Sequence, residues 1–75
     1  TLEYELALIA FTKITIYDLM GNEVKNLVST NQSPGLKSIQ WNSTNNQGES
    51  VSAGVYLYSI EAGNFRQTKK MILLK

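Results

Sequence analysis

The acidic side chains Asp18 and Glu23 are the residues of this sequence that come nearest to a catalytic pair. Two nearby carboxylates can perform general acid–base catalysis, but the stretch between these two, "LMGN", has the glycine and asparagine of a turn, where acidic residues are ordinary. The chain contains no histidine and no cysteine, which removes the commonest nucleophile–base pairs and zinc ligand sets. We therefore expect a protein that is not an enzyme and uses no cofactor.

The polar run "NSTNNQGES", residues 42–50, is the other stretch whose composition could bind a ligand. Calcium sites need several oxygen ligands with net negative charge, whereas this run offers one carboxylate, Glu49, and its glycine is out of register for an EF-hand. The sequence therefore predicts no metal site here. Asn42 begins an N-glycosylation sequon, which matters only in a eukaryotic secretory setting.

Charge and hydropathy exclude further classes of partner. The formal net charge is +1, and 7 basic and 6 acidic residues are scattered along the 75 residues, so we expect no binding to nucleic acid or anionic lipid. The longest apolar run, residues 6–11, is far shorter than the roughly 20 residues of a membrane-spanning helix. Neither a signal peptide nor a membrane span is expected, and since the patterned sequence starts at Thr1 we interpret residues 1–75 as one domain of a longer protein.

Alternating apolar and polar residues predict the strands that position these groups. Residues 2–8 alternate as a half-buried strand, and Ile14 and Ile16 predict a second strand that ends near Asp18 in the hairpin turn "DLMGN". A third strand precedes "NQSPG", in which Pro34 and Gly35 suit a type II turn because Gly35 tolerates a positive φ.

The second half of the chain predicts three further elements. Ile39 and Trp41 share one face of a fourth strand, and residues 42–50 form the longest loop. In the stretch "GVYLYSI" both faces are apolar, because Tyr56, Tyr58 and Ile60 lie on one and Val55 and Leu57 on the other, which is typical of a central strand. A last strand covers residues 65–74. The sequence thus predicts an all-β sandwich of six or seven antiparallel strands.

Four motifs in order, "ITIYDLMGNEV", "PGLKSIQWN", "GESVSAGVYLYSIEAG" and "KKMILLK", make the chain resemble the C-terminal sorting domain of the type IX (Por) secretion system of Bacteroidetes. The immunoglobulin-like domain of flagellar hook-capping proteins is a related family. The resemblance implies an immunoglobulin-like sandwich behind a secreted cargo protein. An outer-membrane translocon would recognise the domain, and a sortase-like protease would remove it at the cell surface.

The sequence departs from this family near its start. The family often has an "NPFNP"-like stretch before its first strand, and its usual Pro or Gly turn after that strand is replaced here by "ALIAFTK". We expect the first two strands to form a hairpin through this connection, residues 7–12.

The resemblance also divides the motif residues into two groups. We interpret one group as structural, because glycines shape turns and strand entries while patterned aromatics pack inward: Gly21, Pro34, Gly35, Trp41, Gly54, Tyr56 and Tyr58. The other group lies in the closing strand. There we expect Lys69 and Lys70 to be solvated charges that protect the edge of a sheet from aggregation.

A terminal strand can be recognised by another protein through backbone pairing, with pockets for alternate side chains. The predicted recognition residues are Lys70, Ile72, Leu73, Leu74 and Lys75. The alternative is a structural or carbohydrate-binding module of an extracellular enzyme, for which Tyr17, Tyr56 and Tyr58 would have to line one exposed face. For a sorting domain we expect a protein that is secreted or at the cell surface, reached through the periplasm and the outer membrane. We then expect no small-molecule substrate.

Overall fold

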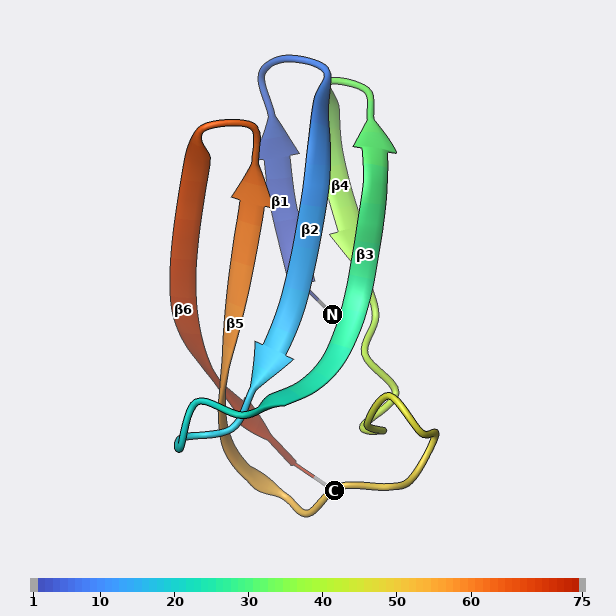
Figure 1. Ribbon diagram of the computed structural model, residues 1–75, viewed down its shortest axis with the longest axis vertical. Helices are drawn as coiled ribbons and strands as arrows, with labels where there is room; N and C mark the ends of the chain where they lie inside the picture. Colours follow the sequence, from blue (N-terminus) through green and yellow to red (C-terminus); the bar gives the residue numbers. More distant parts are fainter. Residues whose placement is uncertain (1, 75) are drawn as a thin grey trace.

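The computed structural model describes residues 2–74, which form two antiparallel sheets facing one another (Figure 1). The strands are β1 (Leu2–Leu6), β2 (Ala10–Tyr17), β3 (Glu23–Gln32), β4 (Gly35–Ile39), β5 (Gly54–Ala62) and β6 (Phe65–Leu73). The larger sheet has the order β3-β2-β5-β6, and the smaller sheet pairs β1 with β4. This confirms the predicted all-β sandwich, with six strands among the described residues.

The first strand is shorter than predicted and has a different partner. Leu2 and Leu6 are buried as the alternation requires, but β1 ends at Leu6 and Leu8 is 77% exposed. The predicted hairpin between the first two strands is wrong, because β1 pairs with β4 and β2 pairs with β3 and β5. Residues 7–9 cross from one sheet to the other, and this crossing takes Leu8 away from the core.

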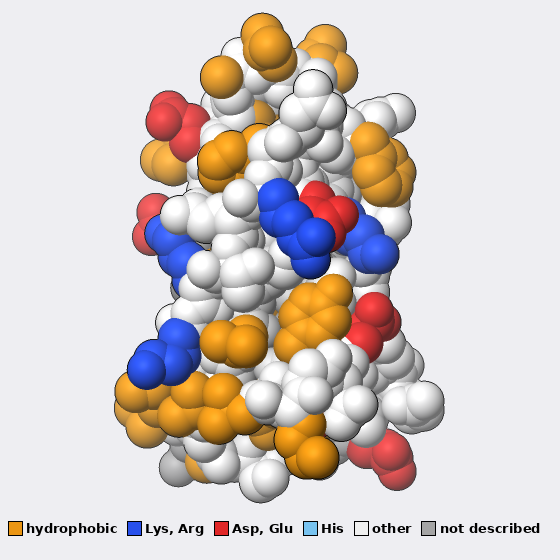
Figure 2. Space-filling model, turned by 60° about the vertical axis from the view of Figure 1, so that its left-hand side comes forward, with side chains coloured by type: hydrophobic (Ala, Val, Ile, Leu, Met, Phe, Trp, Pro, Cys, Tyr) orange, Lys and Arg blue, Asp and Glu red, His pale blue; other side chains and the backbone are white. Residues whose placement is uncertain are grey.

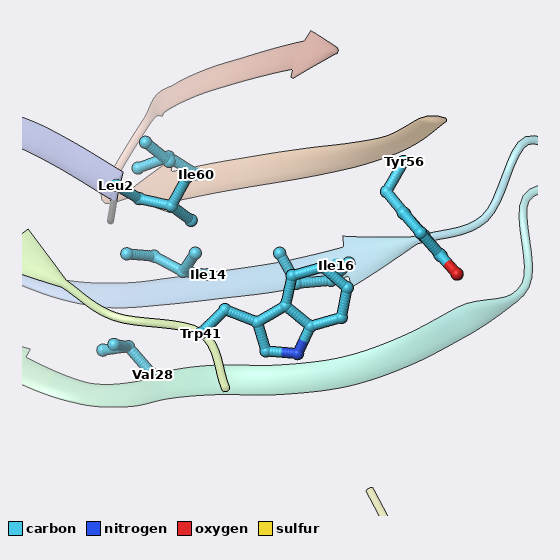
Figure 3. Close-up of a cluster of buried hydrophobic side chains, with 7 residues drawn as sticks. All are labelled: Leu2, Ile14, Ile16, Val28, Trp41, Tyr56 and Ile60. Atoms are coloured by element: carbon cyan, nitrogen blue, oxygen red, sulfur yellow. The ribbon is translucent and has the colours of Figure 1, made fainter. Parts of the chain in front are cut away.

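The centre of the core is formed by β2 and β5, so the prediction that β5 is a central strand is confirmed. Ile14 pairs with Ile60, and Ile16 with Tyr58, on the face of the larger sheet that looks toward β1 and β4; we call this the inner face. Ile14 and Ile16 are both 0% exposed. Burying an isoleucine side chain stabilises a fold by about 1.5–3 kcal/mol. Figure 3 shows the cluster: Leu2, Ile14, Ile16, Val28, Trp41, Tyr56 and Ile60.

Trp41 is buried as predicted but lies outside any strand, since β4 ends at Ile39. Its ring packs edge-to-face on Tyr56, with ring centroids 5.3 Å apart. Its indole Nε1–H donates to the carbonyl oxygen of Thr44 at 2.8 Å, and the Tyr56 hydroxyl donates to the carbonyl oxygen of Ser52 at 2.7 Å. Both aromatic residues therefore satisfy their polar atoms while they fill the space between the sheets.

The predicted structural glycines stand where the chain turns or begins a strand. Gly21 has a φ of 88° in the turn between β2 and β3, which confirms the hairpin there. Gly35 has the expected positive φ, but its value of 132° exceeds the roughly 80° of a type II turn. Pro34 and Gly35 carry the chain from the larger sheet to the smaller one, while Gly54 begins β5.

Candidate functional site

The free edge of β6 is the most open part of the backbone in the larger sheet. Its neighbour is β5, and no other described strand pairs with it. The first six residues of β6 are all exposed. An edge strand presents unpaired N–H and C=O groups to which another chain can bind. The prediction that the closing strand lies at an edge is confirmed.

The opposite edge of the same sheet, β3, is partly covered by the long loop of the chain. The backbone N–H of Asn46 donates to the carbonyl oxygen of Val24 at 2.9 Å. The side-chain Oδ1 of Asn46 in turn accepts from the backbone N–H of Asn26 at 2.9 Å. Since Asn46 thus occupies the place of a neighbouring strand residue, this part of β3 is less available to a partner than β6.

The end of β6 divides its side chains between the two faces of the sheet. Met71 lies opposite Tyr56 and Leu73 opposite Gly54, and both are half-buried against the core. Ile72 lies opposite Val55 on the other face, which we call the outer face, and is 66% exposed. Leu74, just beyond the strand, is 84% exposed.

Of the predicted recognition residues, the structure therefore leaves Lys70, Ile72 and Leu74 exposed. It places Leu73 partly in the core, so that this residue contributes to folding. Lys75 lies outside the described residues.

The smaller sheet leaves the first half of the inner face of β6 uncovered. Phe65, Gln67 and Lys69 belong to that face by register but are exposed. A groove of about 200 Å³ lies there, between residues 3–6 of β1 and β6. Next to it, a pocket of about 590 Å³ is lined by residues 5–10 and 62–65. Figure 2 shows hydrophobic side chains at both ends of this side of the molecule, and cationic side chains with acidic ones beside them across its middle.

Asp18 has a structural role in the turn between β2 and β3. Its Oδ1 accepts from the backbone N–H groups of Met20 and Asn22, both at 2.9 Å, and its Oδ2 accepts from the Asn22 side chain at 3.3 Å. These bonds, above all the one from the Asn22 backbone, hold the pKa of the Asp18 carboxyl below its usual value, because they favour the charged form.

We expect the Asp18 carboxylate to make the stability of the domain depend on pH. Because its pKa is lower in the folded state, its charge stabilises the fold above the ordinary aspartate pKa, about 3.9. That contribution is lost as the pH falls through the lowered folded pKa. Between neutral pH and about pH 2, urea denaturation should show a larger drop in midpoint for the native chain than for Asp18→Asn. Equal drops would contradict this role.

The other acidic residues considered for chemistry are also held by hydrogen bonds. Glu23 accepts from the Asn46 side chain at 2.9 Å, and Glu49 accepts from the Asn45 side chain at 3.2 Å. Among residues 2–74 there is no group of three or more histidine, cysteine, aspartate or glutamate side chains that could hold a metal ion. The same residues include no helix long and apolar enough to cross a membrane.

The tyrosines do not line one exposed face. Tyr56 and Tyr58 lie on the inner face, where Tyr56 is buried and Tyr58 packs against the core. Tyr17 pairs with Leu57 and lies on the outer face. The aromatic platform that the carbohydrate-binding alternative requires is therefore not formed by these three residues.

A family model for the FlgD Ig-like domain matches residues 2–65. The chain therefore belongs to the FlgD Ig-like domain family, and its sandwich is immunoglobulin-like. This agrees with the expected relation to flagellar hook-capping proteins. The comparisons with curated proteins and with solved structures gave no match.

Proposed function

We propose that this domain is a sorting signal that directs a cargo protein across the outer membrane through the type IX secretion system. The sequence motifs support this reading within the broader Ig-like family, since "GVYLYSIEAG" and "KKMILLK" resemble those of sorting domains. The observation that carries the proposal is the open edge of β6, beside which Ile72 and Leu74 are exposed.

Recognition in this proposal takes place by addition of a strand. A strand of the translocon pairs with the free N–H and C=O groups of β6, which supplies affinity, and pockets for alternate side chains supply specificity. Ile72 and Leu74 are the side chains available to such pockets, whereas Met71 and Leu73 pack against the core. The domain acts by binding alone, and a sortase-like protease of the system cleaves it from the cargo at the cell surface.

A fusion experiment tests this function. Residues 1–75 are placed behind a reporter enzyme that carries a signal peptide, in a bacterium with type IX machinery. We expect the reporter at the cell surface or in the medium, and we expect it in the periplasm when the translocon gene is deleted. Retention in the periplasm of both strains, or equal release from both, would contradict the proposal.

A further inference from the structure

The exposed side of β6 is strongly cationic. The strand "FRQTKKMIL" contains Arg66, Lys69 and Lys70 and no acidic residue, so it has three of the seven basic residues of the chain. Arg66 lies 3.5 Å from the carboxylate of Glu61 on β5. Neither Lys69 nor Lys70 forms an ion pair with any residue between 2 and 74. Neither ammonium group is therefore held in an ion pair within the chain, and Lys69 shares the groove of about 200 Å³ with Glu3 and Glu5 of β1.

These charges disfavour a second copy of the chain as the partner. In an antiparallel pair of β6 strands centred on Lys69 or Lys70, the lysine lies directly opposite its own counterpart. A pair centred on Thr68 places Lys70 opposite Arg66. Like charges directly opposite one another destabilise a strand pair, and lysines on an edge are a recognised protection against self-association.

The positions of the two lysines also determine where a strand paired with β6 would need acidic side chains. Lys69 pairs with Tyr58 on the inner face and Lys70 with Leu57 on the outer face, so the two ammonium groups project on opposite sides of the sheet. A strand added along β6 places one side chain opposite each lysine, at two adjacent positions. Opposite charges at such positions stabilise the pair.

We infer that the partner of β6 is an extended protein strand with carboxylate side chains at two adjacent positions, one opposite Lys69 and one opposite Lys70. This inference rests on the proposed function and names the chemistry of the strand that the translocon must present. Charge also separates the free edge of β6 from that of β1, because β1 has the exposed residues Glu3 and Glu5 and would repel the same strand.

Peptide titrations test the inference directly. Two synthetic peptides match the length of β6, which is 9 residues, and alternate threonine with valine. One has two adjacent glutamates at its centre and the other two lysines. Binding is followed by amide chemical shifts of the 75-residue chain in NMR spectra. We expect the glutamate peptide to bind about tenfold more tightly, since two cross-strand pairs change from like to opposite charge, and to shift amides of β6.

Charge reversal provides the matched comparison. In Lys69→Glu/Lys70→Glu the preference between the peptides should reverse, whereas in Lys37→Glu, a change of a lysine on β4, it should remain. The thermal melt of Lys69→Glu/Lys70→Glu should match that of the native chain because both edge lysines are exposed. Equal binding of the two peptides, shifts confined to β1, or dimers of the native chain in sedimentation at low salt would overturn the inference.

The export assay separates this inference from the proposed function. If the native fusion is exported and the Lys69→Glu/Lys70→Glu fusion is exported equally well, the acidic partner strand is wrong while the sorting function stands. If the native fusion is not exported at all, the sorting function fails, and the peptide titration still decides whether β6 selects an acidic strand. We expect export of the charge-reversed fusion to fall about tenfold, in parallel with the loss of binding.

Discussion

Trp41→Ala should leave the domain largely unfolded at room temperature. Removing a buried aromatic side chain costs about 3–5 kcal/mol, and Trp41 is 8% exposed and packs on Tyr56 with ring centroids 5.3 Å apart. Small domains have total stabilities near the lower end of about 5–15 kcal/mol. The cost of this one substitution is therefore comparable with the whole free energy of unfolding.

Urea denaturation followed by circular dichroism measures this effect, with two variants as references. Trp41→Phe keeps a ring in the core but loses the donor to the Thr44 carbonyl, so it should cost about 1–2 kcal/mol. Leu36→Ala on β4 should change stability by less than about 0.5 kcal/mol, because Leu36 is 72% exposed. A midpoint for Trp41→Ala equal to that of Leu36→Ala would show that Trp41 does not support the core.

The residues that share the inner face of the larger sheet could be predicted from the sequence because they follow the period of a strand. Ile14 and Ile16 lie on one face of β2, Tyr56 and Ile60 lie on one face of β5, and all four are buried. Which strands pair could not be predicted in the same way. The alternation of residues 2–8 indicates a strand with one buried face, but it does not indicate which strand pairs with it. The pairing of β1 with β4 depends on contacts between distant parts of the chain.

Thr15 and Ser59 illustrate a second limit. They pair with each other on the outer face, yet their exposed fractions are 2% and 3%. Thr15 alternates with Ile14 and Ile16, so strand periodicity by itself would place Thr15 in contact with solvent. Both residues lie in the two central strands, where neighbouring strands cover short side chains on either side. Burial of a short polar residue at such a position follows from the order of the strands and not from the local sequence.

The sequence predicted that the closing strand lies at an edge, but not which of its side chains face the core. Lys69 and Lys70 in the closing strand predicted an edge strand, and the structure confirms that β6 lies at an edge. The strand ends in the apolar run "MILL". An unbroken apolar run has no alternation, so it cannot indicate which residues face the core. The register with β5 supplies this information, since Met71 and Leu73 pair with Tyr56 and Gly54 while Ile72 pairs with Val55.

This division leads to the second large effect, which concerns export. Replacing both Ile72 and Leu74 with serine should abolish export of the reporter fusion while leaving the thermal melt of the domain unchanged. The two side chains are 66% and 84% exposed, so the fold loses little when they become polar. A partner that pairs with β6 would lose the apolar contacts that fill its pockets.

Leu73→Ser is the matched control. Leu73 lies between Ile72 and Leu74 in the chain, but its side chain is on the inner face of the sheet. Leu73 packs against the core, so Leu73→Ser should lower the free energy of unfolding by about 1–3 kcal/mol, the cost of losing a partly buried leucine, and should lower the melting temperature with it. A chain that stops at Ile72 combines both losses and by itself cannot separate folding from recognition. The double variant can: normal export with serine at positions 72 and 74 would exclude the end of β6 as the recognition element. Blocked export with an unchanged melt would assign recognition to these two exposed side chains, because the neighbouring core residue would remain in place.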